Sequence, residues 1–193
     1  MTRDIKKLFS EHNGYLTTKQ MPDNAIYMAI QRLVNKGVVE RVRRGVYYYP
    51  EVEGELMIDV SKVTPGGVLC LYSAWFYYQL SVQIPQSYCI AIERSRKIKL
   101  PGYPPITLYY WKQTHHELGV TKQMIDGYEV DIYNLEKCVC DAVKYRMKVG
   151  LDVCSEIIRE YLKRKDRNLV RLMEYARKMR IASVIGKYLE IIL

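Results

Sequence analysis

The side chains best suited to recognising another molecule are concentrated between residues 17 and 44. Amide groups can pair with adenine, and guanidinium groups with guanine, through two hydrogen bonds each. A predicted helix over residues 24–36 carries such groups at Asn24, Gln31 and Arg32. With Tyr27 and Met28, these residues lie on the faces that the apolar stripe of the helix leaves outward. Residues of these types on one helix predict contact with base edges in the major groove of DNA.

A second group consists of three arginines around a predicted turn. Arg41, Arg43 and Arg44 precede Gly45 between two β-prone runs. Alternate residues of a strand point to the same face, so Arg41 and Arg43 are expected to share one side. An arginine at the tip of a hairpin can enter a narrow, A·T-rich minor groove or bind phosphate.

Hydroxyl and ammonium groups near the start of a short helix form the third group. Thr17, Thr18 and Lys19 follow the first predicted helix, and Thr17 or Thr18 could cap a helix that reaches Met21. Such groups are typical donors to phosphate oxygens.

The elements that must position these groups follow one another within fifty residues. The spacing of Ile5, Leu8 and Phe9 predicts a helix over 2–12, and the short helix to Met21 comes next. The helix over 24–36 buries Ile26, Ile30 and their helical neighbours, and residues 38–42 and 46–49 form a hairpin. Three helices followed by a hairpin is the order of a winged helix-turn-helix, which predicts a DNA-binding domain over 1–50.

The rest of the chain has a different pattern. Residues 51–66 are expected to connect the first domain to a second domain over 67–193. Within it, a helix is predicted over 71–80, strands over 88–92 and 106–111, and a hairpin of strands 119–125 and 128–133 joined at Asp126-Gly127. Helices are predicted over 134–148, 151–163, 168–179 and 182–192. The expected fold class is α+β: a winged helix-turn-helix, then a domain with a small mixed sheet followed by a helical bundle.

Charge is unevenly distributed along the 193 residues, whose net charge is +9. Basic residues outnumber acidic ones by nine to four in 1–50 and by thirteen to seven in 141–193, against eight to ten in between. An anionic partner, nucleic acid first and an acidic protein second, is the inference. The C-terminal excess predicts a basic surface that includes Lys144, Arg146, Lys148, Lys163, Arg164, Lys165 and Arg167.

Other functional classes find little support in the residues. The sequence has no apolar run long enough for a membrane span and no signal peptide, so a cytoplasmic protein is expected. The five cysteines have no CxxC spacing and predict reduced, buried thiols. His115-His116-Glu117 lacks ligand spacing, so no metal and no cofactor are expected. Asp59, Glu93 and Arg96 could be parts of a nuclease-like site, but the pattern is degenerate and the chain is not expected to be an enzyme.

The order and spacing of several segments resemble the AbiEi family, the antitoxins of type IV toxin–antitoxin systems. The segments that carry the resemblance are 14–47, 71–74, 136–141, 148–152 and 168–177. The resemblance implies a winged helix that binds inverted repeats upstream of its own operon and represses it. It also implies a C-terminal domain that opposes a nucleotidyltransferase-like toxin, not necessarily by binding it, in abortive infection as a phage defence. The family's antitoxic activity is associated with a basic C-terminal surface.

An alternative interpretation stays open. The chain could be a winged-helix regulator whose C-terminal domain senses a ligand or forms a dimer. A bound metabolite, or DNA affinity that responds to one, would favour that alternative.

Overall fold

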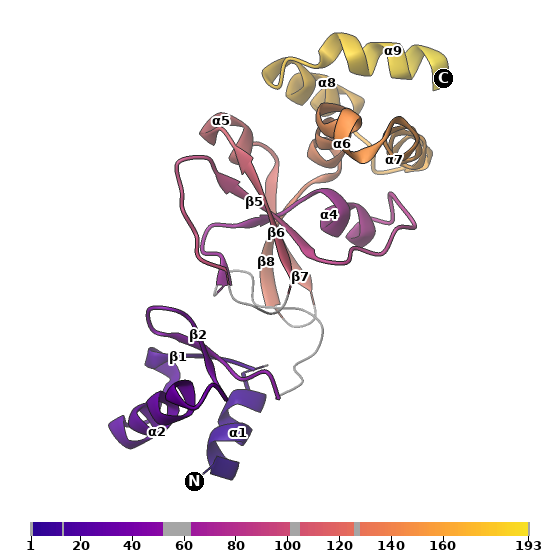
Figure 1. Ribbon diagram of the computed structural model, residues 1–193. Coiled ribbons are helices and arrows are strands. Elements are labelled where there is room, and N and C mark those ends of the chain that lie inside the picture. Colours follow the sequence, from indigo (N-terminus) through magenta and orange to yellow (C-terminus); the bar gives the residue numbers. More distant parts are fainter. Residues whose placement is uncertain (1, 13, 52–62, 101–104, 126–127, 193) are drawn as a thin grey trace. The chain divides into compact units, whose positions relative to one another are not determined.

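The computed structural model describes residues 2–12, 14–51, 63–100, 105–125 and 128–192 (Figure 1). The chain divides into two compact units. The first holds residues 1–66 with the segments 97–104 and 124–130, and the second holds the remainder. The predicted domain limits at 50 and 66 stay predictions, because the expected connector over 51–66 lies mostly outside the described residues.

The first unit contains the elements coloured indigo to purple in Figure 1. They are the helix α1 (Thr2–Ser10), strand β1 (Tyr15–Thr17), the 3₁₀ helix η1 (Thr18–Gln20), helix α2 (Asn24–Asn35), and strands β2 (Glu40–Arg43) and β3 (Val46–Tyr48). The three strands form one antiparallel sheet in the order β1-β3-β2.

Helix α2 forms where the sequence predicts a helix. The carboxylate of Asp23 accepts a hydrogen bond of 2.8 Å from the backbone N–H of Ile26 and so caps the helix. Ile30 is fully buried, and Ile26 and Leu33 pack against the same core as Phe9 of α1 and Tyr47 of β3. This core fixes the helix against the sheet and leaves its opposite face to solvent.

The segment between α1 and α2 differs from the prediction. Residues 15–17 pair with residues 46–48 as β1, where no strand was expected. The predicted short helix is a single 3₁₀ turn, with Thr17 as its N-cap, and it ends at Gln20 instead of Met21. Pairing with β3 holds the backbone of residues 15–17 extended, so only three residues remain for a helical turn.

The second unit is built on a mixed five-stranded sheet in the order β6-β5-β4-β8-β7, of which residues 124–125 and 128–130 are grouped with the first unit. Its strands are β4 (Val68–Leu69), β5 (Tyr88–Glu93), β6 (Ile106–Trp111), β7 (Val120–Ile125) and β8 (Tyr128–Tyr133). β5 runs antiparallel to β4 and parallel to β6, and β4 runs parallel to β8. The predicted strands are present; the short β4 was not predicted, and the predicted Asp126-Gly127 turn lies outside the described residues.

Helices make up the rest of this unit. They are α4 (Leu71–Tyr77), α5 (Gln113–His116), α6 (Leu135–Val149), α7 (Leu151–Lys163), α8 (Leu169–Lys178) and α9 (Ala182–Ile192). The orange and yellow helices α6 to α9 gather at one end of the sheet in Figure 1, and α6 packs on α4, α7, α8 and α9. The α+β class and the order of a mixed sheet followed by helices are therefore confirmed; α4 ends three residues earlier than predicted, and α5 was not predicted.

Candidate nucleic-acid interface

The solvent-facing side of α2 presents a row of three side chains. Asn24, Met28 and Arg32 are exposed, and their spacing of four residues places them one above another on the helix. Met28 leaves 49% of its surface exposed although it is apolar. An amide, a thioether and a guanidinium in one row can contact base edges, including the methyl group of thymine.

Two of the five predicted helix residues have a different environment. Tyr27 was expected on an outward face, but it packs partly against the core because it borders the apolar stripe. Gln31 is half-buried, and its amide donates a hydrogen bond of 2.6 Å to the hydroxyl of Tyr47 in β3. Burial raises the pKa of Tyr47, so the hydroxyl stays protonated. Gln31 therefore ties α2 to the hairpin.

The hairpin between β2 and β3 presents the predicted arginines. Val42 is buried between Arg41 and Arg43, and both arginines are exposed. This agrees with the prediction that alternate residues of the strand share one side. A β-bulge interrupts the register between Arg41 and Arg43. Arg44 is exposed at the two-residue tip, and Gly45 has a φ of 76°, which favours glycine.

The η1 turn lies against this tip. The backbone N–H of Thr18 donates to the carbonyl of Gly45 at 2.9 Å, and a Cβ at Gly45 would lie 3.1 Å from the Thr18 hydroxyl oxygen. Thr18 and Lys19 are exposed, whereas the hydroxyl of Thr17 already donates to the Gln20 side chain at 2.8 Å. The turn thus places Thr18 and Lys19 beside the hairpin and uses Thr17 internally.

The predicted C-terminal basic residues occupy two places. Lys144, Arg146 and Lys148 lie in the second half of α6; the other four lie at the end of α7 and in the turn before α8. Several are engaged internally. Lys144 donates to the carbonyl of Met179 at 3.3 Å, and Arg164 donates twice to Asp166 at 2.9 Å and once to the carbonyl of Tyr78. Arg164 therefore braces α7 against the end of α4, while Lys165 and Arg167 are exposed.

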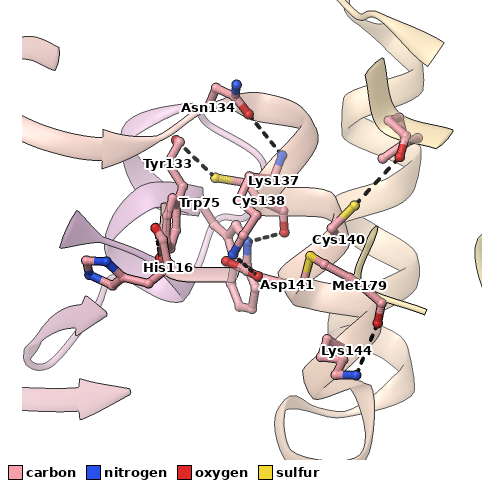
Figure 2. Close-up of polar contacts among 11 residues, drawn as sticks. Trp75, His116, Tyr133, Asn134, Lys137, Cys138, Cys140, Asp141, Lys144 and Met179 are labelled. Carbon is pink, nitrogen blue, oxygen red and sulfur yellow. Dashed lines mark hydrogen bonds and ion pairs between the residues drawn. The ribbon is translucent and has the colours of Figure 1, made fainter. Parts of the chain in front are cut away.

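Sequence reasoning missed a buried charged cluster at the start of α6 (Figure 2). The side chains of Lys137 and Asp141 are both 0% exposed, and the ammonium lies 2.6 Å from the carboxylate. That ammonium also lies 3.8 Å from the ring centroid of Tyr133 and 4.5 Å from that of Trp111. Burial raises the pKa of Asp141 to about 6, against the opposing effect of Lys137.

This cluster joins three elements of the second unit. Lys137 and Asp141 come from α6, Tyr133 ends β8 and Trp111 ends β6. The Tyr133 hydroxyl donates to the carbonyl of His116 at 3.0 Å, and the indole of Trp75 donates to the carbonyl of Cys138 at 3.1 Å. Because every member is enclosed, the cluster fixes α6 on the sheet and offers no access to a substrate.

Among the described residues, the weaker candidates for chemistry do not form a site. Glu93 accepts a hydrogen bond from Ser95, and Asp59 of the nuclease-like set lies outside the described residues. Burial lowers the pKa of both His115 and His116. Within the described ranges no three His, Cys, Asp or Glu residues are grouped to hold a metal ion. All five cysteines are free and buried, as predicted, and none of the described helices could cross a membrane.

Comparison with known proteins agrees with the sequence and the fold. Residues 3–50 match the family model of AbiEi antitoxin transcriptional regulators, which confirms the predicted resemblance for this part of the chain. The crystal structure of the RV2827C protein from Mycobacterium tuberculosis is similar over 97% of this chain and 76% of that one, with a TM-score of 0.60 at 13% identity. This likeness shows a shared fold. No curated protein matches the chain.

Proposed function

We propose that this chain is a DNA-binding autorepressor and the antitoxin of a type IV toxin–antitoxin system. The observation that carries the proposal is the exposed surface of α2, the hairpin tip and η1, within a segment that matches AbiEi antitoxin regulators. Inverted repeats upstream of its own operon are the proposed DNA partner, and a nucleotidyltransferase-like toxin is the proposed functional partner. Abortive infection of phage-infected cells is the proposed setting.

The charge and shape of this surface support DNA as the ligand. Arg32, Arg41 and Arg44 are exposed, and η1 adds Lys19 next to the hairpin tip. A helix about 10–12 Å across fits the major groove, while the hairpin reaches the neighbouring backbone or minor groove. In this arrangement Asn24, Met28 and Arg32 contact bases, Thr18 and Lys19 bind phosphates, and Gln31 sets the position of α2.

A DNA-binding experiment tests the first half of the proposal. We expect binding to the upstream repeats that weakens as salt rises, since cations on the protein displace counterions from DNA. The R43A/R44A double variant should lose affinity and show a smaller dependence on salt. A matched control is K163A/K165A, which removes two cations from the second unit. Unchanged binding by R43A/R44A would exclude the hairpin from the interface.

Co-expression tests the second half. A nucleotidyltransferase-like reading frame beside this gene should arrest growth when expressed alone, and this chain should restore growth. Rescue should persist in R43A/R44A, because the proposed antitoxic part is the second unit, and should weaken when the exposed cations Lys148, Lys165 and Arg167 are replaced together. Failure of the wild-type chain to rescue would overturn the antitoxin proposal and leave the DNA-binding proposal standing.

One observation favours the alternative of a ligand-sensing regulator. The second unit has a pocket of about 360 Å³, within the range of small-molecule sites, and its lining includes Tyr72, Gln83, Gln86 and Tyr109. The lining residues carry no ionised side chain, so a neutral molecule with aromatic and hydrogen-bonding groups would suit it. DNA affinity that changes on adding such a molecule, and fails to change in Y72A, would favour this alternative.

A further inference from the structure

The outer strand β6 has the properties of a pairing edge. It is the last strand in the sheet order, with β5 as its only neighbour in the described part of the sheet. Its sequence, Ile-Thr-Leu-Tyr-Tyr-Trp over 106–111, contains no charged residue and no proline. Natural sheets usually protect such edges with charges, prolines or bulges, because an open edge invites another strand. The opposite edge, β7, does carry a charge at Lys122.

The hydrogen bonds to β5 show which groups of β6 face outward. The N–H of Tyr88 donates to the carbonyl of Pro105, and the N–H of Arg94 donates to that of Trp111. Because backbone groups alternate in direction along a strand, residues 105, 107, 109 and 111 face β5. The N–H and carbonyl groups of Ile106, Leu108 and Tyr110 therefore point away from the sheet.

The side chains of these three residues share one face and are all uncharged. Tyr110 leaves 49% of its surface exposed, and Ile106 and Leu108 are half-buried. On the other face, Tyr109 and Trp111 pack edge-on against Tyr145 of α6, with ring centroids 5.6 and 5.1 Å apart. Helix α6 thus covers the face of the strand that carries Tyr109 and Trp111, whereas Tyr110 is exposed on the other face.

We propose that β6 is a self-association edge at which a second copy of this chain pairs antiparallel, centred on Leu108. Leu108 then lies opposite Leu108 of the second copy, and Ile106 lies opposite Tyr110 on either side. Each of the three residue pairs exchanges two backbone hydrogen bonds, and β-branched residues opposite aromatic ones are favourable pairs. The two sheets join into one sheet through both copies.

The absence of charge on β6 disfavours a charged partner and allows a second copy to approach at this strand. The chain has a net charge of +9, so most of its surface repels another copy, but β6 itself carries no charge. The nearest cation along the chain is Lys112, just beyond the strand. In the antiparallel register the two Lys112 residues lie at opposite ends, about 27 Å apart at 3.4 Å per residue. An acidic partner or nucleic acid would find no charge on β6 to recognise.

Disulfide trapping tests the register. Residues directly opposite in a hydrogen-bonded antiparallel pair have Cα atoms about 5.5 Å apart, a distance that a disulfide spans. Under mild oxidation L108C should form a covalent dimer. Y110C, equally outward but opposite residue 106, should not, and the I106C/Y110C double variant should. M124C, exposed on the opposite edge, is the control for random collision. The native cysteines are buried and should not react.

Sedimentation without DNA tests the association itself and keeps the outcome separate from the proposed DNA-binding function. The wild type should shift from monomer to dimer as its concentration rises, and Y110K should remain monomeric while M124K behaves as the wild type. Unchanged far-UV circular dichroism of Y110K would show that the fold is intact. A wild type that stays monomeric at every concentration, or an L108C variant that crosslinks no faster than M124C, would overturn the proposal.

Discussion

The two units differ in whether they bury charged side chains. In the first unit the arginines of the hairpin and Arg32 of α2 are exposed, and the core is apolar apart from tyrosine hydroxyls. In the second unit Glu136, Lys137 and Asp141 are buried within one helix. Exposed charges contribute little to folding and remain available to a ligand, whereas a buried charge must be paired and contributes mainly to structure. Substitution of the exposed charges should therefore change function, whereas substitution of the buried charges of the second unit should change stability.

The largest expected effect comes from removing one member of the buried pair. K137M leaves the carboxylate of Asp141 enclosed without its partner, which should lower the free energy of unfolding by roughly 3–5 kcal/mol. Both tryptophans, Trp75 and Trp111, lie in the second unit. Tryptophan fluorescence during urea unfolding therefore measures this unit without interference from the first.

The double variant K137M/D141L is the matched control for this prediction. It removes both charges and should recover much of the lost stability, because well-packed apolar residues can replace a buried ion pair. DNA affinity should be unchanged in both variants when measured below their unfolding transitions. A K137M protein as stable as the wild type would show that the pair is not enclosed.

This buried pair also shows where prediction from sequence ends. A lysine and an aspartate four residues apart are an ordinary pattern for a solvated helix face. Only the approach of Trp111 from β6 and Tyr133 from β8, 26 and 4 positions earlier than Lys137 in the sequence, encloses the pair. That approach depends on long-range packing, which no local pattern records.

The first unit was more predictable because its signals are local. The apolar spacing from Ile26 to Val34 identifies α2, and Arg44-Gly45 between two β-prone runs identifies the turn. β1 was missed because it has three residues and is stabilised by β3, about thirty positions later. For the candidate interface, residue type and the alternation of side chains along a strand predicted that Arg41 and Arg43 share a face. They did not predict the hydrogen bond from Gln31 to Tyr47.

A smaller effect is expected from two exposed cations of the first unit, and it should appear in binding alone. R32A should cost about 1–3 kcal/mol on the preferred sequence and relax specificity at one base pair, if Arg32 contacts a base. K19A should weaken binding equally on all sequences and reduce the salt slope by about 1, as loss of one phosphate contact does. Fluorescence anisotropy on a panel of operator variants in a salt series distinguishes the two behaviours.

Neither of these variants should alter unfolding, since both side chains are exposed. Identical specificity profiles for R32A and the wild type would remove Arg32 from the base-contacting row. A change in thermal stability of either variant would contradict the contrast between the two units.

A still smaller effect on stability is expected from the partly buried hydrogen bond between Gln31 and Tyr47 in the first unit. Y47F removes the hydroxyl that accepts from Gln31 and leaves the amide half-buried, which should cost about 1 kcal/mol. Amide hydrogen exchange in α2 and β3 measures this loss. The double variant Q31M/Y47F should regain part of it, because no unpaired amide remains. Equal exchange rates in Y47F and the wild type would show that the bond does not stabilise α2 against the hairpin.

The smallest expected effect is on the pH dependence of stability in the second unit, to which His116 and Asp141 contribute with opposite signs. Burial lowers the pKa of His116, whose ring lies 3.3 Å from the carbonyl of Ala91. As pH falls below about 6.5, the unfolded chain takes up this proton more readily than the folded one, so stability decreases. Asp141 has the opposite sign, because burial raises its pKa in the folded chain to about 6, above the ordinary value of an aspartate. It adds stability as pH falls through that window.

These signs predict how H116Q differs from the wild type. The variant lacks the histidine contribution but retains that of Asp141, so its stability relative to the wild type should rise as pH falls from about 7 to about 5.5. Urea unfolding followed by tryptophan fluorescence at several pH values measures the difference. The D141N variant should shift the slope in the other direction. Parallel pH profiles for H116Q and the wild type would mean that His116 takes up its proton equally well in the folded and unfolded chain. Asp141 would then be the one group of this pair whose titration makes the stability of the second unit depend on pH.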